Sequence, residues 1–215
     1  MAQPQNNAKA VSDKRKTFVY QLAKALAWVL FHTVYPVRIH DRERLNLQGP
    51  CILISNHLCW LDPVCVAHAV KGEEITYLAK KELLESRFGG ALLRALHAIP
   101  VNRHNFDMAA MRACMQALKA GRALGIFPEG TRYKKGNMEE LEAGVALLAL
   151  RSSVPVIPVY IAGKLRPFHM THVYAGKPMA IDDLREMGAS RESSDELLRR
   201  ITVLYAGLAE KAAEA

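Results

Sequence analysis

The feature that most constrains the fold of this chain is a regular alternation of short apolar runs with helix-length segments. Between the runs lie amphipathic stretches, such as 108–118, which Asp107 can cap and Gly121 can close. This alternation predicts one α/β domain with a mixed sheet flanked by helices, and half of the 215 residues are apolar, enough for one sizeable core. The expected strands lie at 37–40, 51–55, 75–79, 99–101, 123–127, 154–161 and 173–181.

Further helices are expected at Pro63 to Val70, Glu82 to Ala98 and Glu139 to Leu150, and a last one begins at Ser193 or Ser194. The apolar run at 154–161 contains two prolines, which cannot donate to a strand ladder. We therefore expect that strand at a sheet edge or at the start of its pairing.

The N-terminal part divides into a polar leader, 1–16, which we expect to be disordered, and an apolar stretch at 17–37. Lys24 near the middle disfavours a membrane-spanning helix. Trp28, Phe31 and Tyr35, with basic residues just before the stretch, favour an amphipathic helix in the membrane interface. The alternative is a helix packed on the core of the protein itself. The rest of the chain, 38–215, is expected to form the α/β domain.

The net charge narrows the classes of binding partner, and the cysteine content narrows the roles that the cysteines can have. The net charge of +8 suits an anionic partner, either nucleic acid, an anionic membrane or a phosphorylated substrate. The four cysteines form no CxxC pair, and they are expected to be reduced core residues rather than zinc ligands or redox centres.

Three polar clusters follow expected strands. Asn56 and His57 with Asp62 come after the run 51–55, Arg103 after 99–101, and the stretch 129–132 after 123–127. Because ligands of α/β sheets bind beyond the carboxyl ends of strands, we expect these clusters to form one site.

His57 and Asp62 have the roles of a base and its orienting carboxylate. Two residues five apart lie about 140° from each other on a helix, so the pair works only if His57 is in the loop and Asp62 starts the helix. One ring nitrogen then donates to the carboxylate, and the other remains a base near neutral pH. Cys59 lies between them as an alternative nucleophile, but His57 is better placed to act on a ligand.

The basic residues of these clusters suit an anion such as a phosphate. Arg103 and Arg132, with Lys80, can gather it, and Thr131 adds a hydroxyl donor. Glu129 is the exception, because a carboxylate repels phosphate. It would have to hold an arginine or bind a substrate hydroxyl.

At this point the chain resembles a known family, the glycerophospholipid acyltransferases typified by 1-acylglycerol-3-phosphate acyltransferase. Asn56–Asp62 and Phe127–Arg132 are similar to its first and third signature blocks, Ala98–Arg103 to the second and Val154–Val159 to the fourth. Their order and spacing also agree, and the likeness runs from about Val37 to Met179. The family commonly has serine where Cys59 stands, which leaves the role of that hydroxyl in doubt.

The resemblance implies transfer of a fatty acyl group from acyl-CoA or acyl carrier protein to the free hydroxyl of lysophosphatidic acid, giving phosphatidic acid. It assigns His57 as base and Asp62 as its orienting residue. No metal, cofactor or nucleic acid is implied; the expected setting is an anionic membrane surface on the cytoplasmic face of the cell membrane, peripheral or monotopic. The acceptor site implied by the resemblance comprises Lys80, Arg103, Glu129, Gly130, Thr131 and Arg132.

Other functional interpretations of the sequence stay open. Glycerol 3-phosphate or another lysophospholipid could accept the acyl group through the same base. A metal-dependent phosphoesterase would use Asn56, His57 and Asp62 as ligands, although no second cluster of His and Asp at strand ends supplies the rest. A membrane-binding module without catalytic activity is the third possibility.

Overall fold

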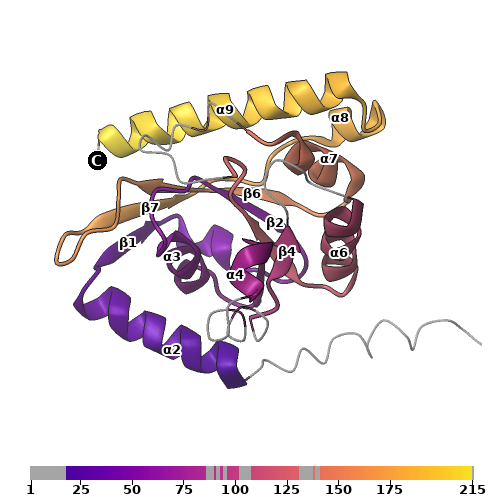
Figure 1. Ribbon diagram of the computed structural model, residues 1–215. Coiled ribbons are helices and arrows are strands. Elements are labelled where there is room, and N and C mark those ends of the chain that lie inside the picture. Colours follow the sequence, from indigo (N-terminus) through magenta and orange to yellow (C-terminus); the bar gives the residue numbers. More distant parts are fainter. Residues whose placement is uncertain are drawn as a thin grey trace, which may run out of the picture.

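The structure is a computed structural model that describes residues 18–85, 90, 93, 96–101, 108–130, 138 and 141–214. Across these residues seven strands form one mixed sheet in the order β1-β7-β6-β2-β5-β3-β4 (Figure 1). Pairing is parallel throughout except between β6 and β7, so β1 and β7 run against the other five. The predicted α/β class with a mixed sheet is confirmed. The strands are β1 (Val37–His40), β2 (Ile52–Ser55), β3 (Ile75–Lys80), β4 (Ile99–Val101), β5 (Ala123–Ile126), β6 (Val156–Ala162) and β7 (Thr171–Ala175).

Helices cover both faces of the sheet. In Figure 1, α2 and α3 lie on one side, while α6, α7, α8 and α9 lie on the other. The bounds are α2 (Phe18–Thr33), α3 (Asp62–Ala69), α4 (Lys81–Glu85), α6 (Met108–Lys119), α7 (Ala143–Arg151), α8 (Asp182–Glu186) and α9 (Arg191–Ala213), with a 3₁₀ turn at Arg42–Leu45.

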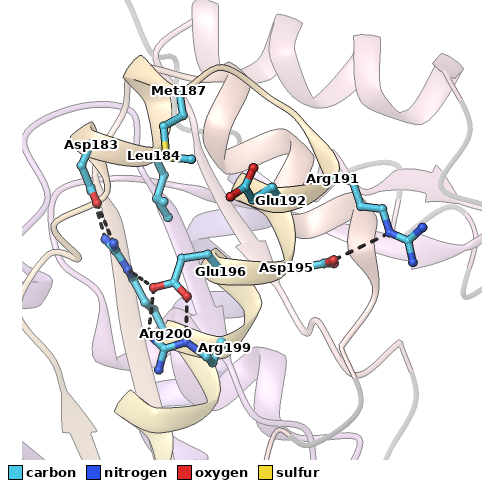
Figure 2. Close-up of a pocket in the computed structure, with 9 residues that line it drawn as sticks. All are labelled: Asp183, Leu184, Met187, Arg191, Glu192, Asp195, Glu196, Arg199 and Arg200. Carbon is cyan, nitrogen blue, oxygen red and sulfur yellow. Dashed lines mark hydrogen bonds and ion pairs between the residues drawn. The ribbon is translucent and has the colours of Figure 1, made fainter.

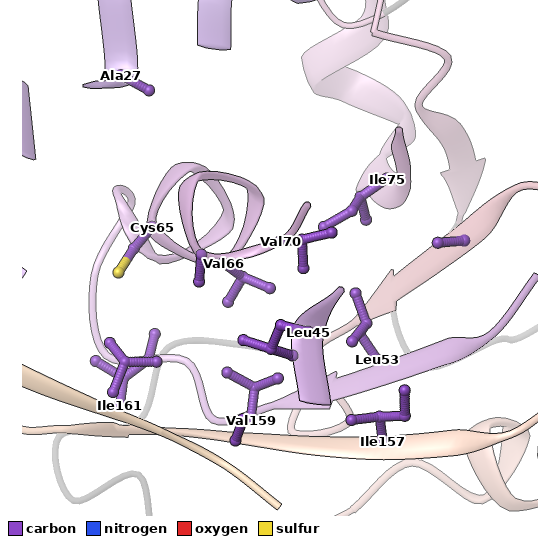
Figure 3. Close-up of a cluster of buried hydrophobic side chains, with 14 of the residues drawn as sticks. Ala27, Leu45, Leu53, Cys65, Val66, Val70, Ile75, Ile157, Val159 and Ile161 are labelled. Carbon is purple, nitrogen blue, oxygen red and sulfur yellow. The ribbon is translucent and has the colours of Figure 1, made fainter. Parts of the chain in front are cut away.

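The central strand β2 explains why the domain has two core layers. Successive side chains of a strand point to opposite faces. Leu53 belongs to the cluster under α2 and α3, shown in Figure 3, whereas Ile52 and Ile54 belong to the cluster under α6, α7 and α9. All three are almost fully buried, which is why this strand reads as a continuous apolar run rather than an alternating one.

Strand β6 corrects one expectation and confirms another. It lies between β2 and β7, so the prediction of a sheet edge is wrong. Pairing with β7 begins at Val159, after both prolines, and the carbonyl of Pro158 accepts a hydrogen bond from the N–H of Gly176. The prolines therefore lie at the start of pairing, where their missing N–H groups cost little.

The N-terminal helix α2 is anchored to the domain by polar contacts. The Tyr20 hydroxyl accepts the N–H of Ile75 at 3.0 Å, and Lys24 Nζ donates to the carbonyl of Val70 at 2.8 Å, at the C-terminal end of α3. Phe31, expected on the membrane side, is instead buried against His68. The helix ends at Thr33, and the expected leader lies outside the described residues.

The other side of α2 is apolar and exposed. Leu22, Leu26 and Val29 follow one another at helical spacing and are about half exposed or more. Among the helices that are described, none combines the length and the apolar character needed to span a bilayer.

The C-terminal helix begins earlier than predicted. Its N-cap is Ser190, which forms a capping box with Ser193, so the serine predicted as the start is the third helical residue. The short α8 was not predicted, and the extended stretch expected to reach Ile181 ends as a strand at Ala175. The predicted helix 82–98 is described only in part.

Candidate active site

The carboxyl ends of β2, β5 and β3 meet at one edge of the sheet because these strands are parallel neighbours. His57 follows β2, Glu129 and Gly130 follow β5, and Lys80 ends β3. This edge therefore brings together Lys80 and the described members of two of the three predicted clusters. Arg103, Thr131 and Arg132 lie outside the described residues.

His57 and Asp62 form the predicted pair. Nδ1 of His57 lies 3.0 Å from Oδ2 of Asp62, with His57 in the loop after β2 and Asp62 as the first residue of α3. The Asp62 carboxylate is an acceptor, so the proton between them sits on Nδ1 and Nε2 is left as the basic nitrogen. The His57 side chain is 18% exposed, which leaves the ring accessible to a ligand.

Asp62 also organises the loop that carries His57. Its Oδ2 accepts the backbone N–H groups of Leu58 and Cys59, each at 2.6 Å, and its Oδ1 accepts the Cys59 thiol at 3.1 Å. The carboxylate is 0% exposed, and all of these donors come from the five residues before it. One buried group thus fixes both the base and the loop.

Cys59 is a donor to this carboxylate rather than a nucleophile. Burial, followed by the hydrogen bond to Asp62, raises the pKa of the Cys59 thiol to about 11. A thiol with that pKa is protonated at neutral pH, and the thiolate is the reactive form. A thiol is also a weaker hydrogen-bond donor than the serine hydroxyl that the resemblance leads one to expect at this position.

Aromatic rings pack beside His57. The ring centroid of Phe127, directly after β5, lies 4.4 Å from that of His57. The Tyr77 ring also stacks on Phe127, with 6.0 Å between the ring centroids, and the Tyr77 hydroxyl donates to the carbonyl of Pro63 at 2.8 Å. These contacts restrict the orientation of the His57 ring. Sequence reasoning did not assign Phe127 a role, although its place at a strand end was visible.

Asn56 has a role that was not predicted. Its Nδ2 donates to the carbonyl of Ile161 at 3.0 Å, and its Oδ1 accepts the N–H of Ile161 at 2.8 Å. The fully buried amide thus pairs with β6 as a backbone peptide would, one residue before His57. It is also engaged on both atoms, which leaves it poorly suited to the metal-ligand role of the phosphoesterase alternative.

Glu129 is buried under the His57 loop, with 4% of its surface exposed. Its Oε2 accepts the N–H of His57 at 2.9 Å, and its Oε1 accepts the N–H of Met138 at 3.3 Å. Burial raises the pKa of Glu129 more than these two hydrogen bonds lower it. Gly130 follows with a φ of +63°, a conformation that favours glycine.

Lys80 is more exposed than the other members. Its Nζ lies 3.4 Å from Oε1 of Glu82, and about a third of its side chain is accessible. It lies two strands away from β2, with β5 between them. The flexible stem of a lysine can turn its charge toward an anion at this edge.

Away from this edge, α8 and the first part of α9 border a shallow surface pocket (Figure 2). Most of its charges pair with one another: Arg200 binds Asp183 at 2.6 Å, and Glu196 accepts from both Arg199 and Arg200. This pocket contains none of the predicted site residues. Among the described residues, no three or more His, Cys, Asp and Glu side chains are grouped so that they could hold a metal ion.

Comparison with known proteins gives a consistent picture. A family model described as Acyltransferase matches residues 36–162, more than half of the chain. The 1-acyl-sn-glycerol-3-phosphate acyltransferase of Streptococcus pneumoniae is 27% identical, covering 96% of this chain and 78% of that protein. The proteins of the same name from Bacillus subtilis and Pseudomonas aeruginosa are 29% and 30% identical, and the chain spans 63% and 61% of their lengths.

Among solved structures, the chain is similar to the crystal structure of the 1-acyl-sn-glycerophosphate (LPA) acyltransferase PlsC from Thermotoga maritima. The TM-score is 0.63 at 21% identity, covering 88% of this chain and 78% of that one. At this identity the likeness shows a shared fold.

Proposed function

The chain belongs to the acyltransferase family, and from that premise we propose that it transfers a fatty acyl group to the free hydroxyl of lysophosphatidic acid, forming phosphatidic acid. The observation that carries the proposal is the His57–Asp62 pair at the carboxyl edge of the sheet, with Nε2 left to act as the base. The relatives named as 1-acyl-sn-glycerol-3-phosphate acyltransferases support this choice of acceptor.

The chemistry requires deprotonation of a hydroxyl and no protein nucleophile. His57 Nε2 takes the hydroxyl proton as the acceptor oxygen attacks the thioester carbonyl, and Asp62 stabilises the imidazolium that forms. The tetrahedral oxyanion then collapses, the carbon–sulfur bond breaks, and the departing thiolate receives the proton from His57. An ester and a free thiol result, so atoms and charge balance without a metal or a resident cofactor.

The acceptor phosphate is proposed to bind Lys80, Arg103 and Arg132, with Gly130 and Thr131 lining the same site. Lys80 and Gly130 lie at the required edge of the sheet, and Thr131 and Arg132 directly follow Gly130 in the chain. Both acyl-CoA and acyl carrier protein present a pantetheine thioester, and either serves as donor in this scheme.

We propose that the protein lies at the interface of an anionic membrane, on the cytoplasmic face of the cell membrane, and the exposed apolar side of α2 supports the interfacial contact. The helix is fixed to the core on its other side by Tyr20 and Lys24, so contact with lipid would hold the whole domain at the surface.

The test is an acyl-transfer assay with lysophosphatidic acid, glycerol 3-phosphate and other lysophospholipids, each with both donors. We expect lysophosphatidic acid to be the best acceptor, His57→Ala to lower kcat by about 10²–10⁴-fold, and Arg132→Ala to raise KM for phosphate-bearing acceptors. Transfer that His57→Ala leaves intact would overturn the mechanism, and activity abolished by a chelator would favour the phosphoesterase alternative.

A further inference from the structure

The segment 163–170, which connects β6 to β7, exposes large apolar side chains that do not pack in the core of the domain. Phe168 is 77% exposed and Met170 is 55% exposed. Phe168 also has a φ of +60°, a left-handed conformation that is unusual for a bulky residue. A strained backbone that holds an aromatic ring in the solvent points to contact with something outside the chain.

Two contacts place this connection between α2 and the loop after β2 that carries His57, which we call the catalytic loop. The N–H of Phe168 donates to the carbonyl of Val34, just after α2, at 2.6 Å. Leu165 is buried in the core, and its backbone contacts the Cys59 thiol in the loop that follows His57. Figure 1 shows the connection beyond the C-terminal end of α2, on the side of the molecule away from β4.

The charge of the connection identifies its partner. Lys164 and Arg166 are exposed beside the apolar side chains, and a mixture of basic and large apolar groups suits an anionic lipid surface. We propose that segment 163–170 is a second membrane contact, in which Phe168 and Met170 enter the lipid interface beside the catalytic loop. The proposal rests on the proposed function only in that the acyl acceptor is a membrane lipid.

The test is co-sedimentation of the full chain with vesicles of phosphatidylcholine and phosphatidylglycerol, without turnover. We expect Phe168→Asn and Met170→Ser each to weaken partitioning by up to about tenfold, since each withdraws an apolar side chain from lipid. Asparagine tolerates the left-handed conformation, so folding is preserved. Lys164→Gln and Arg166→Gln should each weaken binding about fivefold, and only to vesicles that contain phosphatidylglycerol.

Met187→Ser and Val203→Ser are matched controls, because these side chains are 55% and 59% exposed but belong to the α8–α9 side of the sheet. Partitioning that Phe168→Asn leaves unchanged, or that the controls weaken equally, overturns the proposal. Wild-type protein that binds vesicles through segment 163–170 but transfers no acyl group would instead contradict the proposed function and leave the membrane contact standing.

A second inference concerns Glu129 and rests on different contacts. Both of its carboxylate oxygens accept backbone N–H groups, from His57 and from Met138, and the side chain is buried. Through these contacts, Glu129 connects the catalytic loop with Met138, which directly follows the segment 131–137. That segment contains Arg132. We infer that Glu129 is a positioning residue that fixes the backbone of His57, rather than a group that touches the acyl acceptor.

A positioning residue and a ligand of the acyl acceptor predict different kinetic effects when Glu129 is replaced. Glu129→Gln replaces one acceptor oxygen by an NH₂ group that must face an N–H, so the loop shifts and kcat should fall by about a hundredfold with little change in KM for the acceptor. Glu129→Asp keeps two acceptor oxygens on a shorter side chain, so it should lose less kcat than Glu129→Gln.

Arg132→Ala supplies the contrast, because loss of a phosphate ligand raises KM. If Glu129→Gln raises KM for the acceptor while kcat stays the same, Glu129 is an acceptor ligand and the inference is wrong. If Glu129→Gln leaves both kcat and KM unchanged, the carboxylate does not position His57. An inactive wild type would contradict the proposed function instead.

Discussion

Asp62→Asn tests whether one carboxylate supports both the base and the loop. Asn is nearly the same size as Asp, and its amide oxygen can take the place of Oδ2, with the NH₂ group turned toward the Cys59 sulfur. The hydrogen bonds from His57, Leu58 and Cys59 to Oδ2 then persist without the charge. A bond to a charged group contributes about 1 kcal/mol more than a neutral one, so three of them predict a loss of about 3 kcal/mol in the free energy of unfolding.

The same change should lower kcat by about 10²–10⁴-fold, because a neutral amide does not stabilise the imidazolium. Urea unfolding measures the first effect and acyl transfer at saturating substrate the second. Asp182→Asn is the matched control: that side chain is 86% exposed, and we expect its change in stability to stay within about 0.5 kcal/mol. Wild-type stability with a lowered kcat would refute the role in the loop, and an unchanged kcat would refute the base pair itself.

Three further predictions test other parts of the molecule. Gly130→Ala should destabilise the fold by about 1–2 kcal/mol from its positive φ alone. The loss should exceed that of Gly163→Ala, because a Cβ at Gly130 would lie 2.9 Å from Glu142 Oε1 whereas Gly163 faces open space. Urea unfolding of the two variants compares their stabilities. Burial, followed by the nearby Arg42, His32 and Lys24, lowers the pKa of His68 to about 4. Because the folded pKa lies below that of the unfolded chain, stability is present above pH 6.5 and is lost as the pH falls toward 4; about 2 kcal/mol should disappear between pH 7 and 5, and His68→Leu should remove that loss from the unfolding curves. Cys59→Ser should keep kcat within a few fold, and abolished acyl transfer would instead identify the thiol as the nucleophile.

The sequence predicts most of the architecture because strands and helices here have distinct apolar patterns. The strand ends also predict which described residues lie at the same edge of the sheet, as His57, Glu129 and Lys80 do. Strand β6 shows the limit of local reasoning. Its prolines indicated either a sheet edge or the start of pairing, and only the second holds, because the strand is central and its pairing with β7 starts after Pro158.

The supporting shell of the site was less predictable than its reactive residues. Asn56 was visible in the motif, but its pairing with Ile161 depends on the neighbouring strand, which no local pattern specifies. Glu129 was recognised as an exception among basic residues, although the sequence offered a substrate hydroxyl or an arginine as its partner instead of the N–H of His57. Phe31 was placed toward the membrane because its helix is apolar on more than one side, and only packing against His68 decides which side is buried.

The contacts that hold the loop after β2 also bear on how the protein folds. Asn56 meets a partner 105 residues later, His57 one 72 residues later, and the carbonyl of Ile54 accepts the hydroxyl of Tyr205, 151 residues away. Contacts between such distant segments carry the loop-closure entropy of nearly the whole domain and form late. We therefore expect the loop that carries His57 to reach its final position only after these distant segments have met, so activity should return late during refolding, and a fragment that ends before α9, and so lacks Tyr205, should recover little of it.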